Sequence, residues 1–215
     1  MSADAREQMI EQQVRAWEVL DERILDTFRK VPREAFTPPQ YRFLAYADAE
    51  VPLPGGQHML RPSVVGRLLT ALELTGRERV LEIGTGSGFI TACLRMLSKT
   101  VQSLEIVPEL ADMARRTLAT RGLRDIDVVG SDAMTFEPTG RFDAIAVTAS
   151  LPTYDSRWQS ALAVGGRLFV VVGTAPIMEA RLVRRVAEDA CTDESLFQTV
   201  IDPLVHAERP VAFDF

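Results

Sequence analysis

Residues 79–89 read Arg-Val-Leu-Glu-Ile-Gly-Thr-Gly-Ser-Gly-Phe and constrain the fold more than any other stretch of the chain. A short apolar run is followed by three alternating glycines, Gly84, Gly86 and Gly88, and then by apolar residues at helical spacing. This order predicts a strand, a tight turn and a helix, whose first N–H groups point at a closely approaching ligand. Because turns also collect glycine for purely structural reasons, the loop alone is weak support for a binding site.

The residues around the loop narrow the choice of ligand. Residues 100–104 form a second apolar segment that ends in Glu105, where an acid can accept hydrogen bonds from both ribose hydroxyls of a nucleoside. Dinucleotide-binding loops read G-x-G-x-x-G, whereas this loop reads G-x-G-x-G with Glu82 two residues before it. The closer spacing resembles the first motif of S-adenosylmethionine-dependent methyltransferases, whose cofactor carries an ammonium that an acid near the strand end favours. An NAD-dependent dehydrogenase and a purely structural turn are the alternatives.

Composition limits the partners and the compartment. The chain has 215 residues, enough for one domain with a full core, and its net charge of −6 gives no basic footprint for nucleic acid. No apolar run approaches the roughly 20 residues of a membrane span, and the N-terminus is too polar for a secretory signal. Cys93 and Cys191 lack metal-ligand spacing. We therefore expect a cytoplasmic protein with no metal and neither nucleic acid nor membrane as a partner.

The remaining chain alternates apolar strands with helices, which predicts an α/β fold with a doubly wound, Rossmann-like sheet. The strands are expected at residues 79–83, 100–104, 126–129, 142–147 and 167–172, with helices from Pro62, after Gly88, from Pro108 to Gly122, and over residues 155–164. Antiparallel edge strands are expected at residues 179–186 and 196–205. An amphipathic helix over residues 6–19 and a second one capped by Asp21 precede an irregular segment over residues 51–62. We expect residues 1–75 to form a helical region that covers the active site and residues 76–215 to bind the cofactor, within one structural unit.

Ligands of such sheets bind outside the carboxyl ends of the strands. Asp132 follows the third strand, where it can accept a hydrogen bond from an adenine amino group, with the Ala133 N–H near a ring nitrogen; it can equally cap an Asx turn. The expected cofactor contacts are Glu82, Gly84, Thr85, Gly86, Gly88, Glu105, Asp132, Ala133 and Thr148.

Segments spread along nearly the whole chain resemble protein-L-isoaspartate O-methyltransferases. They are Val31-Pro32-Arg33-Glu34-x-Phe36, Gly56-Gln57 with Pro62, the glycine loop, Val147-Thr148-Ala149, Gly165-Gly166 and Pro203-Leu204. The resemblance implies S-adenosylmethionine as the cofactor, S-adenosylhomocysteine as the product, and damaged proteins or peptides as the substrate. The family methylates the free carboxylate of isoaspartyl residues. A carboxylate is already ionised at neutral pH, so the reaction needs no general base.

The departures from the family pattern fall at the acceptor side. The family usually reads Gly-Gln-Thr-Ile-Ser-x-Pro where this chain has His58 for the threonine and Leu60 for the serine that the family uses to place the acceptor carboxylate. We expect His58, Met59 and Leu60 to contact the substrate, with no residue assigned to catalysis. Because leucine cannot donate a hydrogen bond, the segment predicts weak isoaspartyl methylation. A different, small acceptor and a cofactor-binding protein that has lost transfer are the alternatives.

Overall fold

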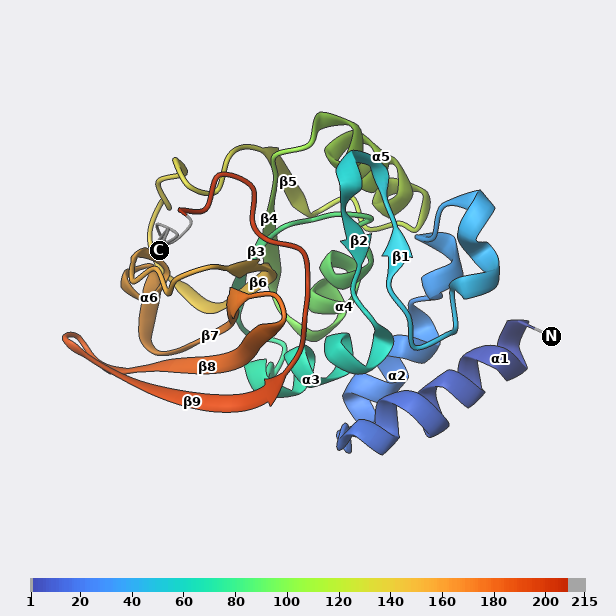
Figure 1. Cartoon of the computed structure of the whole chain (residues 1–215), viewed down its shortest axis with the longest axis horizontal. Helices are drawn as coiled ribbons and strands as arrows, with labels where there is room; N and C mark the ends of the chain where they lie inside the picture. The colour runs from blue at the N-terminus through green and yellow to red at the C-terminus, as the bar shows by residue number, and fades with distance from the viewer. Residues whose placement is uncertain (1, 209–215) are drawn as a thin grey trace, which may run out of the picture.

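Seven strands form one sheet in the computed structural model, which describes residues 2–208. In chain order they are β3 (Arg79–Ile83), β4 (Thr100–Glu105), β5 (Asp127–Gly130), β6 (Phe142–Leu151), β7 (Leu162–Thr174), β8 (Ile177–Ala187) and β9 (Ala190–Gln198). Their order across the sheet is β5-β4-β3-β6-β7-β8-β9 (Figure 1). The pairs from β5 to β7 are parallel, and β8 and β9 are added antiparallel. The predicted α/β fold class is therefore confirmed, as are its antiparallel edge strands.

The helices begin close to where the sequence places them. They are α1 (Ser2–Met9), α2 (Glu22–Lys30), α3 (Pro62–Leu72), α4 (Phe89–Leu97), α5 (Pro108–Thr120) and α6 (Arg157–Ser160). A π turn over Ile10–Val14 and a 3-10 turn over Arg15–Trp17 extend α1. Asp21 caps α2 as predicted, since its side chain accepts a hydrogen bond from the Arg23 N–H. Short 3-10 turns over Arg33–Ala35, Pro39–Leu44 and Pro54–Gly56 complete the N-terminal region.

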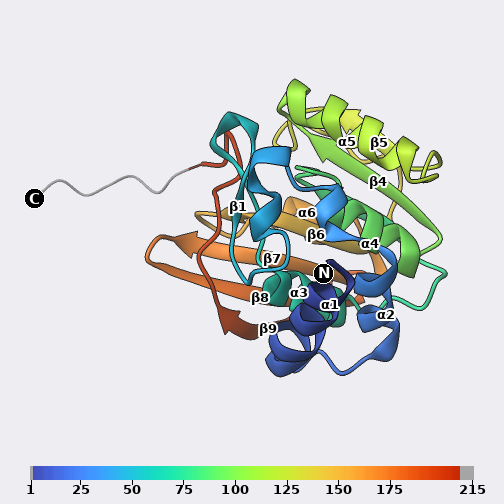
Figure 2. The same cartoon turned by 90° about the vertical axis from the view of Figure 1, so that its right-hand side faces the viewer.

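Apolar side chains bury both faces of the sheet, because successive strand residues point to opposite sides. Phe169 and Val171 of β7 belong to one buried cluster, whereas Leu168 and Val170 belong to the other. The first cluster also contains most apolar side chains of α2, α3 and α4, and Figure 2 shows these helices packed beside one another. The Phe28 ring of α2 lies 6.0 Å from the Phe89 ring of α4, so the N-terminal region and the glycine-loop helix share one core.

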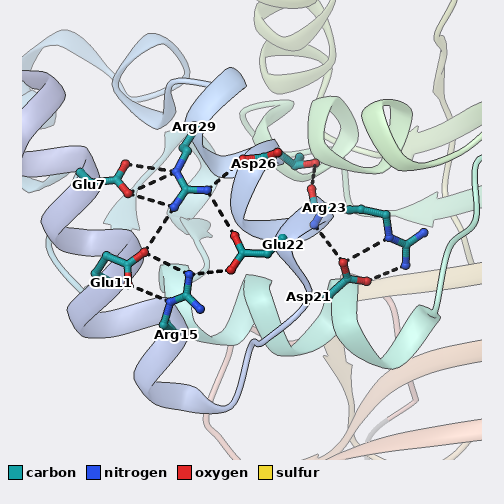
Figure 3. Close-up of polar contacts among 9 residues, drawn as sticks. Glu7, Glu11, Arg15, Asp21, Glu22, Arg23, Asp26 and Arg29 are labelled. Carbon is teal, nitrogen blue, oxygen red and sulfur yellow. Dashed lines mark hydrogen bonds and ion pairs between the residues drawn. The ribbon is translucent and has the colours of Figure 1, made fainter.

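A network of ion pairs holds the extended α1 segment against α2 (Figure 3). Arg29 of α2 contacts Glu7 at 2.9 Å and Glu11 at 3.3 Å, and Arg15 bridges back to Glu22 of α2 at 2.8 Å. A single exposed ion pair contributes about 0–1 kcal/mol to stability. These contacts therefore stabilise the packing of α1 on α2 mainly because they share partners.

The helix predicted over residues 155–164 is wrong beyond its first turn. Helix α6 ends at Ser160, and β7 begins at Leu162, which pairs with Phe142. A short apolar run such as residues 161–164 fits either a strand or a buried helix by periodicity alone. Pairing with β6 stabilises the strand conformation of this run.

The predicted second edge strand, residues 196–205, is also displaced. Strand β9 spans Ala190–Gln198, and the chain then leaves the sheet. An edge strand with mostly exposed side chains shows no alternation of apolar residues, and its charges discourage further strand pairing. In the segment predicted to be irregular, a short ladder forms between β1 (Val51–Pro52) and β2 (His58–Met59).

Candidate functional site

A cleft opens at the carboxyl ends of β3, β4, β5 and β6. It holds about 660 Å³ of space, part of it open to solvent, within the usual range for small-molecule sites. The predicted site residues that line it are His58, Leu60, Gly84, Gly86, Glu105, Asp132, Ala133 and Thr148. A smaller cavity of about 310 Å³, here called the side cavity, shares several walls with the cleft and is also lined by Thr85 and Met59. Residues from distant parts of the sequence thus meet at one edge of the sheet.

Only glycine fits at the first position of the glycine turn. Gly84 has φ +98°, and a Cβ atom there would lie 2.5 Å from Oγ1 of Thr148. That hydroxyl is within hydrogen-bond distance of the carbonyl oxygens of Ile83 and Gly84, at 2.9 and 2.7 Å. Thr148, in the neighbouring strand β6, therefore fixes the turn. The backbone of the turn forms part of the cleft wall.

Glu105 anchors the same loop to the end of β4. One carboxylate oxygen accepts the Gly86 N–H at 2.7 Å, and the other accepts the Val107 N–H at 2.9 Å. Its side chain is buried but reaches the cleft. Each carboxylate oxygen can accept two hydrogen bonds, so this group retains one position on each oxygen for a ribose diol. The cleft therefore fits the nucleoside end of S-adenosylmethionine.

Asp132 forms the Asx turn that the sequence allowed and also lines the cleft. Its Oδ1 accepts the Met134 N–H at 2.8 Å, which closes the Asx turn, while the side chain also lines the cleft beside Ala133. Its Oδ2 lies 2.7 Å from Nδ1 of His206, and this contact lowers the pKa of Asp132. The contact with His206 thus favours the ionised form of this acid at the cleft.

Glu82 lies inside the protein rather than at the cleft. Its Oε2 accepts hydrogen bonds from Oγ1 of Thr91 at 2.5 Å and Oγ of Ser103 at 2.6 Å, and burial raises its pKa to about 8. Thr85 continues this network, with its Oγ1 2.6 Å from Oγ of Ser103. The sequence predicts a direct contact of Glu82 with the cofactor ammonium, but in this geometry Glu82 is not placed to make that contact.

Gly88 is also explained by packing inside the protein. It precedes the first residue of α4 with φ +85°, and a Cβ there would lie 3.3 Å from Ala114 of α5. Its lack of a side chain lets α4 and α5 approach each other behind the loop.

The acceptor segment also lines the cleft. Nδ1 of His58 lies 2.9 Å from Oδ2 of Asp202, and both residues line the cleft. Leu60 is 6% exposed and lines both the cleft and the side cavity. Met59 lines the side cavity but not the cleft, and the Thr37 hydroxyl contacts its sulfur at 3.8 Å. The three predicted substrate residues therefore lie together around the side cavity, which the glycine loop also lines.

The chain after β9 also forms part of the site, although no pattern in the sequence predicts it. Ser150 of β6 donates its N–H to the Asp202 carbonyl at 2.8 Å and accepts the Leu204 N–H at the same distance. These bonds bring residues 202–205 into the cleft wall, and in Figure 2 this segment rises beside β1. Pro203-Leu204 was recognised only as part of a resemblance, because no pattern in the sequence links it to Ser150.

Within residues 2–208, no three His, Cys, Asp or Glu side chains are grouped so that they could hold a metal ion. Over the same residues, no helix is both long enough and apolar enough to cross a membrane.

The sheet order, the glycine turn and the acids that follow two neighbouring strands define a Rossmann-like methyltransferase that uses S-adenosylmethionine. The family model described as protein-L-isoaspartate(D-aspartate) O-methyltransferase matches residues 4–209. The chain therefore belongs to the protein-L-isoaspartate O-methyltransferase family.

Individual relatives agree with this assignment over nearly their full length. Protein-L-isoaspartate O-methyltransferase 2 of Pelobacter propionicus is 40% identical over 205 residues, which cover 94% of this chain and 91% of the relative. A protein-L-isoaspartate O-methyltransferase of Rhodopseudomonas palustris is 41% identical over 203 residues, 93% of each chain. A Plasmodium falciparum structure, described as a methyltransferase of this type in complex with S-adenosyl-L-homocysteine, has a TM-score of 0.79 at 20% identity. It covers 92% of this chain and 96% of its own. The last similarity supports the fold.

Proposed function

We propose that this enzyme methylates the free carboxylate of isoaspartyl residues in damaged proteins or peptides, more weakly than relatives with hydroxyls at positions 58 and 60. The observation that carries the proposal is the meeting of two sets of residues at one cleft. The acids Glu105 and Asp132 line it together with His58 and Leu60. A cofactor and an acceptor can therefore be held next to each other.

The cofactor-binding part of the proposal assigns a role to each cleft residue. Glu105 accepts hydrogen bonds from the ribose hydroxyls, Asp132 accepts one from the adenine amino group, and the Ala133 backbone contacts the base. The glycine turn lets the cofactor lie against the backbone, a role supported by Gly84 and Gly86, which both line the cleft. When bound, S-adenosylmethionine supplies a methyl group on a sulfonium, which is reactive toward an oxygen nucleophile.

On the acceptor side, the protein needs to position a carboxylate and exclude water. An ionised carboxylate requires no general base, and its orientation toward the methyl group determines the rate. Leu60 excludes water but donates no hydrogen bond. His58, held by Asp202, is the polar group that this wall offers the acceptor.

We assign the acceptor side to residues 1–75 and the cofactor side to residues 76–215. This division is supported by the β1–β2 hairpin, which contributes Leu53, Gln57 and His58 to the lining of the cleft. We also place the enzyme in the cytoplasm, a proposal supported by Cys93 and Cys191, which are both free thiols.

A second candidate acceptor is a small molecule that carries an oxygen nucleophile. Leu60 favours it, because its buried apolar side chain suits an acceptor with an apolar portion better than the free carboxylate of an isoaspartyl residue. A protein that binds the cofactor without transferring its methyl group is the third candidate, and S-adenosylhomocysteine formation with any acceptor would exclude it.

The double variant His58→Thr with Leu60→Ser tests the proposal. Restoring one hydroxyl contact to the acceptor is worth about 1–3 kcal/mol, so kcat/KM for an isoaspartyl peptide should rise roughly tenfold or more. An unchanged or lower value, with unchanged affinity for S-adenosylhomocysteine, would show that these positions do not limit isoaspartyl methylation.

A further inference from the structure

Arg33 is a buried cation with no polar partner within residues 2–208. Its side chain is 1% exposed, yet none of its three guanidinium nitrogens has a hydrogen-bond partner there. Buried polar groups are nearly always hydrogen-bonded, and a buried charge without a partner is especially unfavourable. Burial lowers the pKa of Arg33 to about 10, so the guanidinium still carries its charge at neutral pH.

The groups around Arg33 do not satisfy this charge. The Phe89 ring lies 5.2 Å from the guanidinium carbon, a cation–π contact that offers no hydrogen-bond acceptor in the plane of the guanidinium. The charge of Asp48 acts on Arg33, but its carboxylate accepts the N–H and hydroxyl of Ser63. Across the described chain, no carboxylate lies within 4.0 Å of the Arg33 guanidinium.

Arg33 lines the side cavity, whose other walls belong to the proposed reaction site. The glycine loop from Gly84 to Ser87 forms one wall, and the acceptor segment from His58 to Leu60 forms another. The cavity shares residues with the cleft, so a ligand in the cleft can extend a polar end into it.

We propose that Arg33 is a carboxylate-binding residue of this site, whose guanidinium receives a carboxylate that enters the side cavity. The planar guanidinium can form two parallel hydrogen bonds with a carboxylate. The inference rests on the proposed function, which brings two carboxylates here: one at the methionine end of the cofactor, the other on the acceptor. The chemistry at Arg33 is the same for both sources, and binding measurements separate them.

The test compares the wild-type protein with Arg33→Met, which keeps an unbranched apolar stem and removes the guanidinium with its charge. Calorimetry would measure S-adenosylhomocysteine and 5′-methylthioadenosine, which share the nucleoside and thioether, whereas only S-adenosylhomocysteine carries the amino-acid end with its ammonium and carboxylate. An isoaspartyl peptide would then be titrated into protein saturated with S-adenosylhomocysteine. Arg42→Met, an exposed arginine of the same N-terminal region, is the matched control for loss of charge.

Two results would support the proposal. If the cofactor supplies the carboxylate, Arg33→Met should weaken S-adenosylhomocysteine about tenfold or more and leave 5′-methylthioadenosine unchanged. If the acceptor supplies it, both nucleosides should bind as in the wild type and the peptide should bind about tenfold more weakly. Arg42→Met should change none of the three affinities.

The proposal is overturned if Arg33→Met unfolds cooperatively and all three affinities stay within about twofold of wild type. If Arg33→Met does not fold, Arg33→Lys decides by the same criteria, because lysine keeps the charge and loses the bidentate geometry. A wild-type protein without methyl transfer would count against the proposed function alone, since the nucleoside comparison does not depend on turnover.

Discussion

Nδ1 of His58 lies 2.9 Å from Oδ2 of Asp202, although the two residues are 144 positions apart in the chain. The contact joins the hairpin that carries the acceptor segment to the chain that returns from β9. Both side chains are about one-third exposed, so the pair lies at the rim of the cleft rather than in its floor. It fixes which ring nitrogen of His58 remains for the substrate.

We predict that Asp202→Asn weakens acceptor binding and leaves the cofactor unaffected. The amide keeps the shape of the side chain but holds the imidazole less firmly, a loss of about 0.5–1.5 kcal/mol, or roughly 2- to 10-fold in the KM for an isoaspartyl peptide. Steady-state kinetics with calorimetry of S-adenosylhomocysteine would measure both effects. Asp189→Asn, in the exposed turn before β9, is the control. An unchanged KM would remove His58 from the acceptor site.

Glu105→Ala should weaken cofactor binding by about 1–3 kcal/mol. The variant removes the acceptor for the ribose hydroxyls and leaves the partly buried Gly86 N–H without its partner. Calorimetry with S-adenosylhomocysteine measures the effect, and Glu109→Ala, an exposed acid in the first turn of α5, provides the comparison. Equal affinities for the two variants would contradict the role of Glu105. The same site predicts no thermal stabilisation by NAD.

Gly84→Ala and Gly76→Ala separate backbone strain from steric conflict. Both glycines have positive φ, +98° and +93°, but a Cβ at Gly76 meets nothing within 4 Å, whereas one at Gly84 meets Thr148 at 2.5 Å. We expect Gly76→Ala to lose about 1–2 kcal/mol of unfolding free energy, and Gly84→Ala to lose more and to bind S-adenosylhomocysteine poorly. Chemical denaturation would measure this. Similar losses for both variants would show that the Thr148 contact does not restrict the turn.

Glu82→Gln should change how stability depends on pH. Glu82 ionises near pH 4.5 in the unfolded chain, and burial raises its pKa to about 8 in the folded protein. Between these values the folded state binds more protons, so the stabilisation is complete below pH 4.5 and is lost as pH rises to about 8. Glutamine cannot ionise. The variant should therefore gain a few kcal/mol of unfolding free energy relative to wild type between about pH 5 and pH 9. A difference that stays constant with pH would contradict the buried, protonated state of Glu82.

The sequence allowed the sheet domain to be predicted because local patterns specify it. The glycine turn, the continuous apolar strands and the proline at the start of α3 and α5 each act within a few residues. The misplaced elements depend on distant pairing instead. Residues 161–164 join the sheet through β6, and β9 is too exposed on both sides to show alternation.

The same distinction holds at the candidate site. Glu105 and Asp132 were predicted because strand ends in a parallel sheet meet at one edge. Asp202 was missed because its position depends on the hydrogen bonds of Ser150 with the returning chain. Arg33 was noticed only as part of a family-like segment, since burial without a partner cannot be read from residue types.

The most direct test is methyl transfer from labelled S-adenosylmethionine to an isoaspartyl peptide and to the matched peptide with ordinary aspartate. We predict transfer to the isoaspartyl peptide alone, with one S-adenosylhomocysteine formed per methyl ester. In Glu105→Ala, kcat/KM for this peptide should fall by about tenfold or more. Equal transfer to both peptides, or none to either while S-adenosylhomocysteine still binds, would contradict the assignment of this cleft to isoaspartyl methylation.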